Sequence, residues 1–136
     1  MGWLLILLLC GVLAAIAVSR RSRAQRQTRA ATVELRFESG MVVRRTADGR
    51  KESARWSNVS EVEFVRTPVK TADGANQFIL VGEDPEHGCL IPLGIGHDPE
   101  LIRHLAMLDG FSVERFHSER RRAGTGREVI WTRSLA

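Results

Sequence analysis

The chain of 136 residues has few of the residues from which metal-binding motifs are built. It contains two cysteines, and no CxxC or HxxxH pattern accompanies the neighbouring pair His87 and Cys89. A zinc site requires three or four ligands at suitable spacing, so we expect no metal site and no cofactor. Cys10 lies in an apolar segment far from Cys89, so we also expect both thiols to be reduced.

Motifs for catalysis and phosphate binding are also missing. There is no nucleophile elbow, and the acids of residues 83–86 fall in a loop where water should solvate them. Gly94 and Gly96 precede a predicted helix as a phosphate loop would, but no Gly-Lys-Ser/Thr follows, and Asp98 would repel a phosphate. We therefore predict that the chain is not an enzyme and has no catalytic residues.

Acidic side chains are absent from the first 32 residues, and this uneven distribution changes the meaning of the net charge of +4. The juxtamembrane stretch 20–32 contains five arginines, which are Arg20, Arg21, Arg23, Arg26 and Arg29. The rest of the chain has fifteen basic and sixteen acidic residues, so it is near neutral and we expect no nucleic-acid partner. The basic run 120–122 is interpreted as a solvated helix end.

The first nineteen residues carry no charged side chain. Residues 2–18 form an apolar run that would span about 26 Å as a helix, close to the ~30 Å hydrocarbon core of a bilayer. A cleaved signal peptide would carry its positive charge before the apolar run, whereas here the arginines follow it. The sequence therefore predicts a transmembrane helix over residues 1–19, with Trp3 at one interface.

The arginines that follow the apolar run predict its orientation. Positive charge stays on the cytoplasmic side of a membrane, so we expect a single-pass protein of the bacterial inner (plasma) membrane with its N-terminus outside. Residues 33–136 would then be a cytoplasmic domain. The five arginines form a predicted membrane-surface site, and the lipid bilayer is a predicted partner.

The region after residue 32 shows the period-two alternation of β-strands. Turn signals at Ser39-Gly40 and Asp48-Gly49 separate the first runs, which indicates antiparallel hairpins. A tryptophan, Trp56, precedes the fourth run. The six predicted strands cover residues 33–38, 41–46, 50–56, 61–67, 77–82 and 89–94.

Helix signals begin at Asp98, a predicted N-cap followed by Pro99. Apolar residues then recur on one face up to Leu108, and Ser112 is placed to cap a second, short helix ending near residue 122. A final strand is predicted over residues 128–132. The fold class is therefore α+β: an N-terminal transmembrane helix, then an antiparallel β barrel or sandwich with one or two C-terminal helices and a final strand.

The order of these features resembles a pleckstrin-homology-like domain. The stretches that carry the likeness are residues 48–64, 89–94 and 105–111 and the terminal strand with Trp131. It is similar to small uncharacterised bacterial single-pass membrane proteins with such a domain in the cytoplasm. The resemblance departs from the standard pattern because a strand follows the helices. It implies a binding or scaffolding module, since this fold hosts recognition more often than chemistry.

Five further aromatic or histidine residues are candidates for a site. Trp56 could pack in the barrel or form part of a groove, and we favour core packing. His104 and His117 lie on the two predicted helices, where surface or boundary positions are the ordinary explanation and no ligand role is expected. Phe116 and Trp131 are interpreted as core residues rather than as nucleic-acid contacts.

Two functions follow from this organisation. The first is a membrane-anchored cytoplasmic binding or scaffolding module without catalytic activity, whose partner would be a membrane protein or a second copy of the chain. The alternative is a small accessory subunit of a larger membrane complex, associating through small residues of its transmembrane helix. A membrane-bound enzyme would need a pocket of convergent polar groups, which the sequence does not show.

Overall fold

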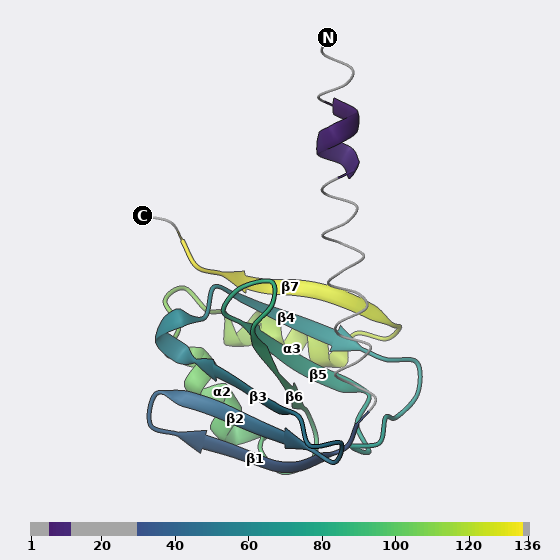
Figure 1. Ribbon diagram of the computed structural model, residues 1–136, viewed down its shortest axis with the longest axis vertical. Helices are drawn as coiled ribbons and strands as arrows, with labels where there is room; N and C mark the ends of the chain where they lie inside the picture. The colour runs from purple at the N-terminus through teal and green to yellow at the C-terminus, as the bar shows by residue number, and fades with distance from the viewer. Residues whose placement is uncertain (1–5, 12–29, 135–136) are drawn as a thin grey trace.

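The computed structural model describes residues 6–11 and 30–134. Residues 30–134 form two antiparallel sheets with two short α-helices, and a 3-10 helix, η1, lies between the sheets in the chain (Figure 1). The elements are β1 (Thr32–Glu38), β2 (Met41–Thr46), β3 (Lys51–Arg55), η1 (Trp56–Asn58), β4 (Glu61–Arg66), β5 (Gln77–Gly82), β6 (Gly88–Pro92), α2 (Asp98–Ala106), α3 (Val113–Arg121) and β7 (Gly126–Thr132).

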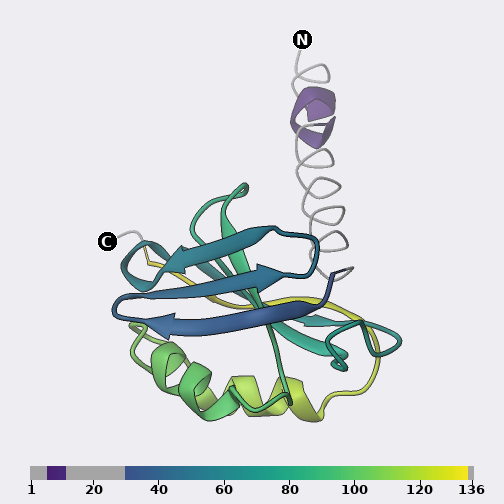
Figure 2. The same cartoon turned by 60° about the horizontal axis from the view of Figure 1, so that its bottom comes forward.

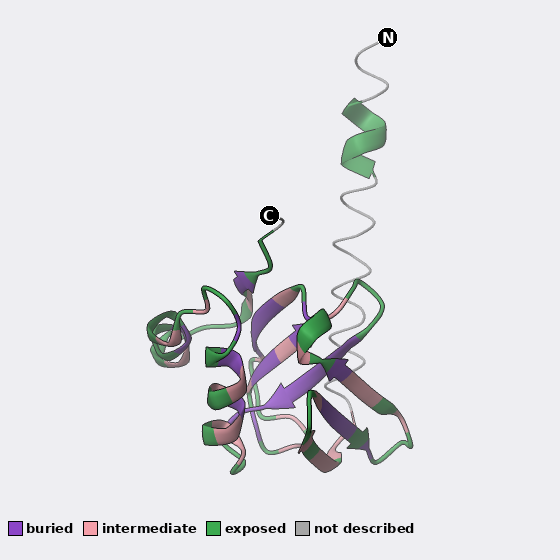
Figure 3. Cartoon of the chain, turned by 90° about the vertical axis from the view of Figure 1, so that its left-hand side faces the viewer, coloured by how far each residue is buried: buried purple, intermediate pink, exposed green. Residues whose placement is uncertain are grey.

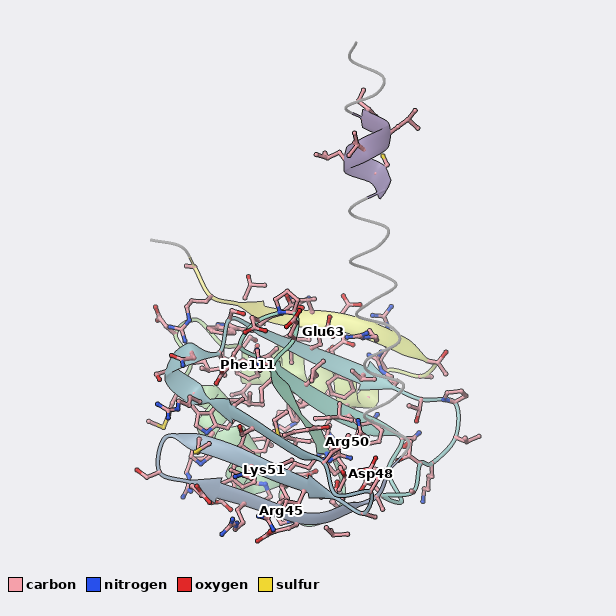
Figure 4. All side chains as sticks on the ribbon, in the orientation of Figure 1. Arg45, Asp48, Arg50, Lys51, Glu63 and Phe111 are labelled. Atoms are coloured by element: carbon pink, nitrogen blue, oxygen red, sulfur yellow. The ribbon has the colours of Figure 1, made fainter. Side chains whose placement is uncertain are left out.

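The first sheet is a meander of three strands in the order β1-β2-β3. Its hairpins turn where the sequence predicted, at Ser39-Gly40 and at Asp48-Gly49. Gly40 and Gly49 both have positive φ, 76° and 85°, a conformation that residues with a Cβ rarely adopt. Asp48 and Arg50 lie at the tip of the second hairpin, on the side opposite the first turn (Figure 4).

The second sheet has four strands in the order β6-β5-β4-β7, with every neighbouring pair antiparallel. The final strand, β7, therefore returns to pair with β4 after the two helices. It carries a bulge opposite Val62 and Glu63, and Arg127 forms an ion pair with Glu63 across the pair. This return connection places the end of β7 beside η1 (Figure 1).

The two sheets approach each other along β3 and β6, where carboxylates join them in place of a backbone ladder. The Glu52 carboxylate accepts from the Leu90 amide at 3.0 Å, and the Glu83 carboxylate accepts from the Arg55 amide at 2.5 Å. Because these strand amides are bonded to side chains, the facing edges of β3 and β6 are closed to other strands at these points.

The main hydrophobic core lies between the sheets and the helices (Figure 3). Its fully buried members come from both sheets and from both helices, including Val42, Phe64, Ile79, Leu101 and Phe116. α2 contributes Leu101 and Leu105, the positions that share one helical face. The two helices lie together along one side of the domain (Figure 2).

α3 is held to the second sheet by a buried ion pair. Arg66 on β4 donates to both the carboxylate and the backbone carbonyl of Glu119, and both side chains are almost fully buried. At the start of the helix the Ser112 hydroxyl accepts from the Arg115 amide at 3.1 Å, which confirms the predicted N-cap. The N-cap of α2 is His97, one residue before the predicted Asp98.

A second buried polar group, here named the Arg44 cluster, lies near the β2–β3 turn. The Arg44 guanidinium is fully buried and donates to Glu52 at 3.0 Å, to Asp73 at 3.4 Å and to the Thr32 hydroxyl at 2.7 Å. It also donates to the Ala30 carbonyl at 3.1 Å. Asp73 in turn accepts from the Thr32 amide at 2.5 Å. The cluster therefore ties the start of β1, strands β2 and β3 and the β4–β5 loop together.

The structure corrects the N-terminal prediction. Within residues 6–11 and 30–134, no helix combines the length and the apolar character that crossing a membrane requires. The predicted transmembrane helix is therefore contradicted, as are the single-pass inner-membrane location and the cytoplasmic topology that depended on it.

Parts of that prediction lie outside the described residues. These are residues 1–5 and 12–19 of the apolar run and the five arginines of the membrane-surface site, Arg20, Arg21, Arg23, Arg26 and Arg29. The accessory-subunit function, which was to use this helix for association, is not tested by the structure and stays a prediction. The strands and helices predicted between residues 33 and 132 are each confirmed within about two residues, a usual uncertainty at element ends.

Candidate functional site

A groove of about 600 Å³ opens where the two sheets and α2 meet. Its walls come from three places: the β1–β2 turn with η1, the C-terminal end of α2 with the residues that follow it, and the end of β7. Figure 3 views the molecule from the side on which these three segments lie. The floor contains the aromatic rings of Trp56 and Trp131 together with Leu108. We name this hollow the Trp56 groove.

One wall of the groove contains the rings of His104 and Trp56, which belong to a stack of three rings. The His104 ring lies between Phe37 and Trp56, with centroid separations of 5.4 Å and 5.1 Å. The interplanar angles are 7° and 1°, so the three planes are nearly parallel. Phe37 comes from β1, His104 from α2 and Trp56 from η1, so the stack joins three elements that are distant in the chain.

The environment of His104 favours its neutral form. Burial between the two rings lowers the pKa of His104 below its ordinary value, and the neighbouring Arg103 lowers it further. Glu100 acts in the opposite direction, but its effect is smaller. A neutral imidazole stacked between two aromatic rings gives this wall an apolar surface.

The rim of the groove carries polar side chains of both charges. Arg133 follows β7, and its guanidinium donates to the carbonyls of Val59 at 2.8 Å and Trp56 at 3.4 Å. It also lies 5.8 Å from the centre of the Trp131 ring. Asp109 also lines the groove, and its backbone carbonyl accepts from the Trp131 indole at 2.8 Å. Within residues 30–134, neither the Arg133 nor the Asp109 side chain forms an ion pair.

Two other groups at the groove are unusual. Met107 directly follows α2 and is 80% exposed, although it is a large apolar side chain. The indole nitrogen of Trp56 is buried, and no group in the described part of the chain accepts its hydrogen. Buried indole N–H groups usually have an acceptor, so burial of the Trp56 N–H in this arrangement is energetically unfavourable.

The groove contains a serine, a histidine and an aspartate, but not in a catalytic arrangement. Nucleophilic catalysis requires the hydroxyl to be hydrogen-bonded to the base and the base to be oriented by a third group. None of the hydrogen bonds found in residues 30–134 joins Ser57, His104 and Asp109. These three side chains therefore do not form a hydrogen-bonded triad in the described part of the chain.

The sequence-predicted candidates do not converge on this groove, apart from Trp56, His104 and Trp131. Cys89 is fully buried and His87 is exposed, and burial raises the pKa of the Cys89 thiol far above its ordinary value. The His87 ring instead lies 2.8 Å from the Asp84 carboxylate, and this hydrogen bond lowers the pKa of Asp84. The pair therefore does not form a joint metal-binding site.

The other candidates are explained by local contacts. The Gly94 amide donates to the Asp98 carboxylate at 2.9 Å, so a carboxylate occupies the position that a phosphate would need. Arg120 pairs with Asp98 at 2.5 Å, and Arg122 pairs with Glu119 at 3.7 Å. His117 is exposed on α3 and lies against the edge of the Phe116 ring. Phe116 and Trp131 are buried, which confirms their interpretation as core residues.

The sequence reasoning missed how the site is assembled. Trp56 packs against the core, as predicted, but it is only partly buried and lines the groove as well. Nothing in the spacing of Phe37, Trp56 and His104 shows that they meet. The one available signal was Met107, an apolar residue placed off the buried face that Leu101, Leu105 and Leu108 define.

Comparison of the chain with protein-family models, with curated proteins and with solved structures found no match to any of them. The resemblance to pleckstrin-homology-like domains therefore stays a prediction. The structure by itself gives an α+β domain with two antiparallel sheets and an aromatic groove at the end of both.

Proposed function

We propose that the domain of residues 30–134 is a binding module without catalytic activity. Its Trp56 groove would take a bulky apolar side chain from an extended peptide segment of a partner protein. The observation that carries this proposal is the groove itself, which is lined by two tryptophans and by charged and hydroxyl-bearing side chains. Its volume lies within the ~300–1,000 Å³ range of ligand pockets.

The chemistry of the rim supports a peptide rather than a phosphorylated ligand. The rim contains one cation, Arg133, one anion, Asp109, and the hydroxyls of Ser57 and Ser134. A phosphate would be attracted by excess positive charge and repelled by the carboxylate. A peptide backbone is uncharged and presents both N–H donors and C=O acceptors, so it can bond to Asp109 and Arg133 together.

The construction of the groove supports binding without a large rearrangement. Each ring of the Phe37–His104–Trp56 stack is held by a different element, and Arg133 is fixed by two backbone carbonyls. Side chains that are already ordered lose little conformational entropy when a ligand binds. Tryptophan is also the residue type most enriched among the side chains that dominate binding energy at interfaces.

The experiment uses the full chain and a short peptide as the probe. The probe is N-acetylated, C-amidated Gly-Trp-Gly, and the same peptide with glutamate at its centre is the comparison. Binding is followed by nuclear magnetic resonance of the indole N–H signals of Trp56 and Trp131. We expect the tryptophan peptide to shift both signals, with the weak, millimolar affinity of a ligand this small.

A matched pair of variants tests the location. Met107→Glu places a charge on the rim of the groove, where it would oppose an apolar ligand, and Met107 is exposed enough for the fold to tolerate the change. Val69→Glu adds the same charge at another exposed position, in the β4–β5 loop. Met107→Glu should abolish the indole shifts and Val69→Glu should retain them. Equal binding of both probe peptides, or equal behaviour of both variants, would contradict the proposal.

A further inference from the structure

The outer edge of β1 is an open strand edge. Among the described strands β1 pairs with β2 alone, and it forms the lower margin of the first sheet in Figure 1. The facing edges of β3 and β6 are joined by the Glu52 and Glu83 carboxylates. The free edge of β7 is partly covered, because Arg115 donates to the Val129 carbonyl at 3.0 Å. β1 and β7 are thus edge strands of seven residues each, and within residues 30–134 only the β7 edge has a side chain bonded to it.

The hairpin turn determines which β1 groups face outward. A two-residue turn is closed by a hydrogen-bonded pair, here Glu38 and Met41, and such pairs then alternate along an antiparallel ladder. Arg36 therefore bonds to β2, whereas the amides and carbonyls of Leu35 and Phe37 point away from it. None of the hydrogen bonds to loops or side chains within residues 30–134 uses these outward groups.

The charges on β1 alternate in sign. Glu34, Arg36 and Glu38 share the outer face of the strand, and Arg36 pairs with Glu34 at 3.0 Å and with Glu38 at 3.4 Å. A strand with charges of one sign would repel a second copy of itself. With alternating signs, two antiparallel copies of β1 can be aligned so that each charge faces an opposite charge. Cross-strand pairs of opposite charge stabilise a sheet, and like charges directly opposite destabilise it.

We propose that β1 pairs with β1 of a second copy of this chain, antiparallel and centred on Leu35. In this register Leu35 faces Leu35 of the second copy, and the outward backbone groups of both strands align. Glu34 faces Arg36 of the second copy and Arg36 faces its Glu34, so four side chains form one cluster of alternating charge. The two three-stranded sheets become one continuous sheet of six strands.

The alternative registers that align the outward groups are less favourable. Centring the pair on Arg36 would place Arg36 opposite Arg36 and Glu34 opposite Glu38, which brings like charges together. Centring it on Phe37 would pair Arg36 with Glu38, but only the second half of each strand would overlap.

Disulfide trapping tests the pairing and its register together. Two variants of the full chain, Glu34→Cys and Arg36→Cys, are made in a Cys10→Ser background, because Cys10 is exposed and Cys89 is buried. The two chains are mixed in equal amounts, one of them isotope-labelled, and oxidised. In the proposed register, positions 34 and 36 form a non-hydrogen-bonded pair with Cα atoms about 4.5 Å apart, which suits a disulfide.

The three products of this mixture report different registers. We expect the mixed 34–36 disulfide to exceed the 36–36 disulfide, which reports the register centred on Arg36, by roughly tenfold. A Val69→Cys chain in the same background gives the rate of random collision, since Val69 is exposed in a loop. A 34–36 product no faster than this rate, or a dominant 36–36 product, would overturn the proposal.

Charge variants give a second measurement that does not depend on cysteine. By sedimentation, Arg36→Glu and Glu34→Arg should each weaken self-association roughly tenfold, and an equal mixture of the two should restore it. In the mixture each introduced charge meets an opposite charge on the other chain. Association through the exposed apolar residues 6–9 would be the same in all of these samples and would not show this rescue. Absence of the rescue would also overturn the proposal.

Discussion

The two ends of the first sheet are built from opposite chemistry. At the β2–β3 end the Arg44 cluster is buried, charged and densely hydrogen-bonded. At the β1–β2 end the Trp56 groove is open and aromatic, with polar groups on its rim that have no ion-pair partner in residues 30–134. The β2–β3 end of the sheet is therefore closed and contains buried charges, whereas the β1–β2 end is open and contains aromatic rings.

This difference separates structural polar groups from groups available for binding. A buried guanidinium is tolerated only when carboxylates and hydrogen bonds compensate it, so the Arg44 cluster has little capacity left for a ligand. The groove contains the reverse: an exposed methionine, and an indole N–H and a carboxylate for which residues 30–134 supply no acceptor and no ion-pair partner. Binding capacity therefore lies at the end where the protein's own contacts are incomplete.

The largest effect is expected from replacing the cation of the closed end. Arg44→Met leaves the carboxylates of Asp73 and Glu52 buried without their cation, which should lower the free energy of unfolding by about 3–5 kcal/mol. Arg45→Met removes the adjacent arginine, which is exposed on the outer face (Figure 4), and should change it by less than about 0.5 kcal/mol. Urea denaturation measures both. Equal losses would show that burial of Arg44 is not decisive.

A smaller effect on the free energy of unfolding is expected when one aspartate at each end of the sheet is replaced by asparagine. Asp73→Asn keeps an oxygen acceptor for the Thr32 amide but removes the charge facing Arg44, so it should cost about 1–3 kcal/mol. Asp109→Asn changes a carboxylate on the groove rim and should stay within about 0.5 kcal/mol. Both values come from the same denaturation experiment. A large loss for Asp109→Asn would mean that the rim contributes to folding and is not reserved for a ligand.

The strands could be predicted better than the groove. Strands depend on contacts within a few residues, whereas the groove depends on contacts between residues that are distant in the chain. Strand alternation and the two Gly turns act within a few residues, so β1 to β3 could be located from the sequence. The contacts of Arg44 with Asp73 and of Phe37 with His104 cross 29 and 67 positions of the chain. No local pattern encodes such contacts, and a strand containing Arg44-Arg45 gave no sign that one arginine is buried.

The N-terminal prediction failed for a related reason. Composition describes the residues of an apolar run but not the helix that they form, and within residues 6–11 and 30–134 no helix is long and apolar enough to cross a membrane. Trp56 was a partial success: core packing was predicted, and its ring does contact the core, but it also lines the groove. A residue at the boundary between core and surface can serve both purposes, which residue type alone cannot distinguish.

The pH dependence of the free energy of unfolding tests the contribution of His104 at the groove. Because burial lowers the pKa of His104 below its ordinary value of 6.5, the unfolded chain takes up a proton before the folded chain does. The free energy of unfolding should therefore fall as the pH drops below about 6.5. His104→Phe keeps a ring in the stack but cannot titrate, so it should flatten this dependence, whereas His87→Gln, at an exposed histidine, should not. The midpoint of urea denaturation at a series of pH values measures this, and an unchanged slope in His104→Phe would contradict it.

The smallest expected effect on stability is at Met107, and it is the most informative about the groove. Because Met107 is 80% exposed, Met107→Ala should change the free energy of unfolding by less than about 0.5 kcal/mol. The same change removes apolar surface from the rim, so binding of the acetylated, amidated Gly-Trp-Gly probe should weaken by about 1 kcal/mol, roughly fivefold. Val69→Ala, at a comparably exposed position outside the groove, should leave both quantities unchanged. Loss of stability without loss of probe binding would assign Met107 to the core and would remove the contrast between the two ends of the sheet.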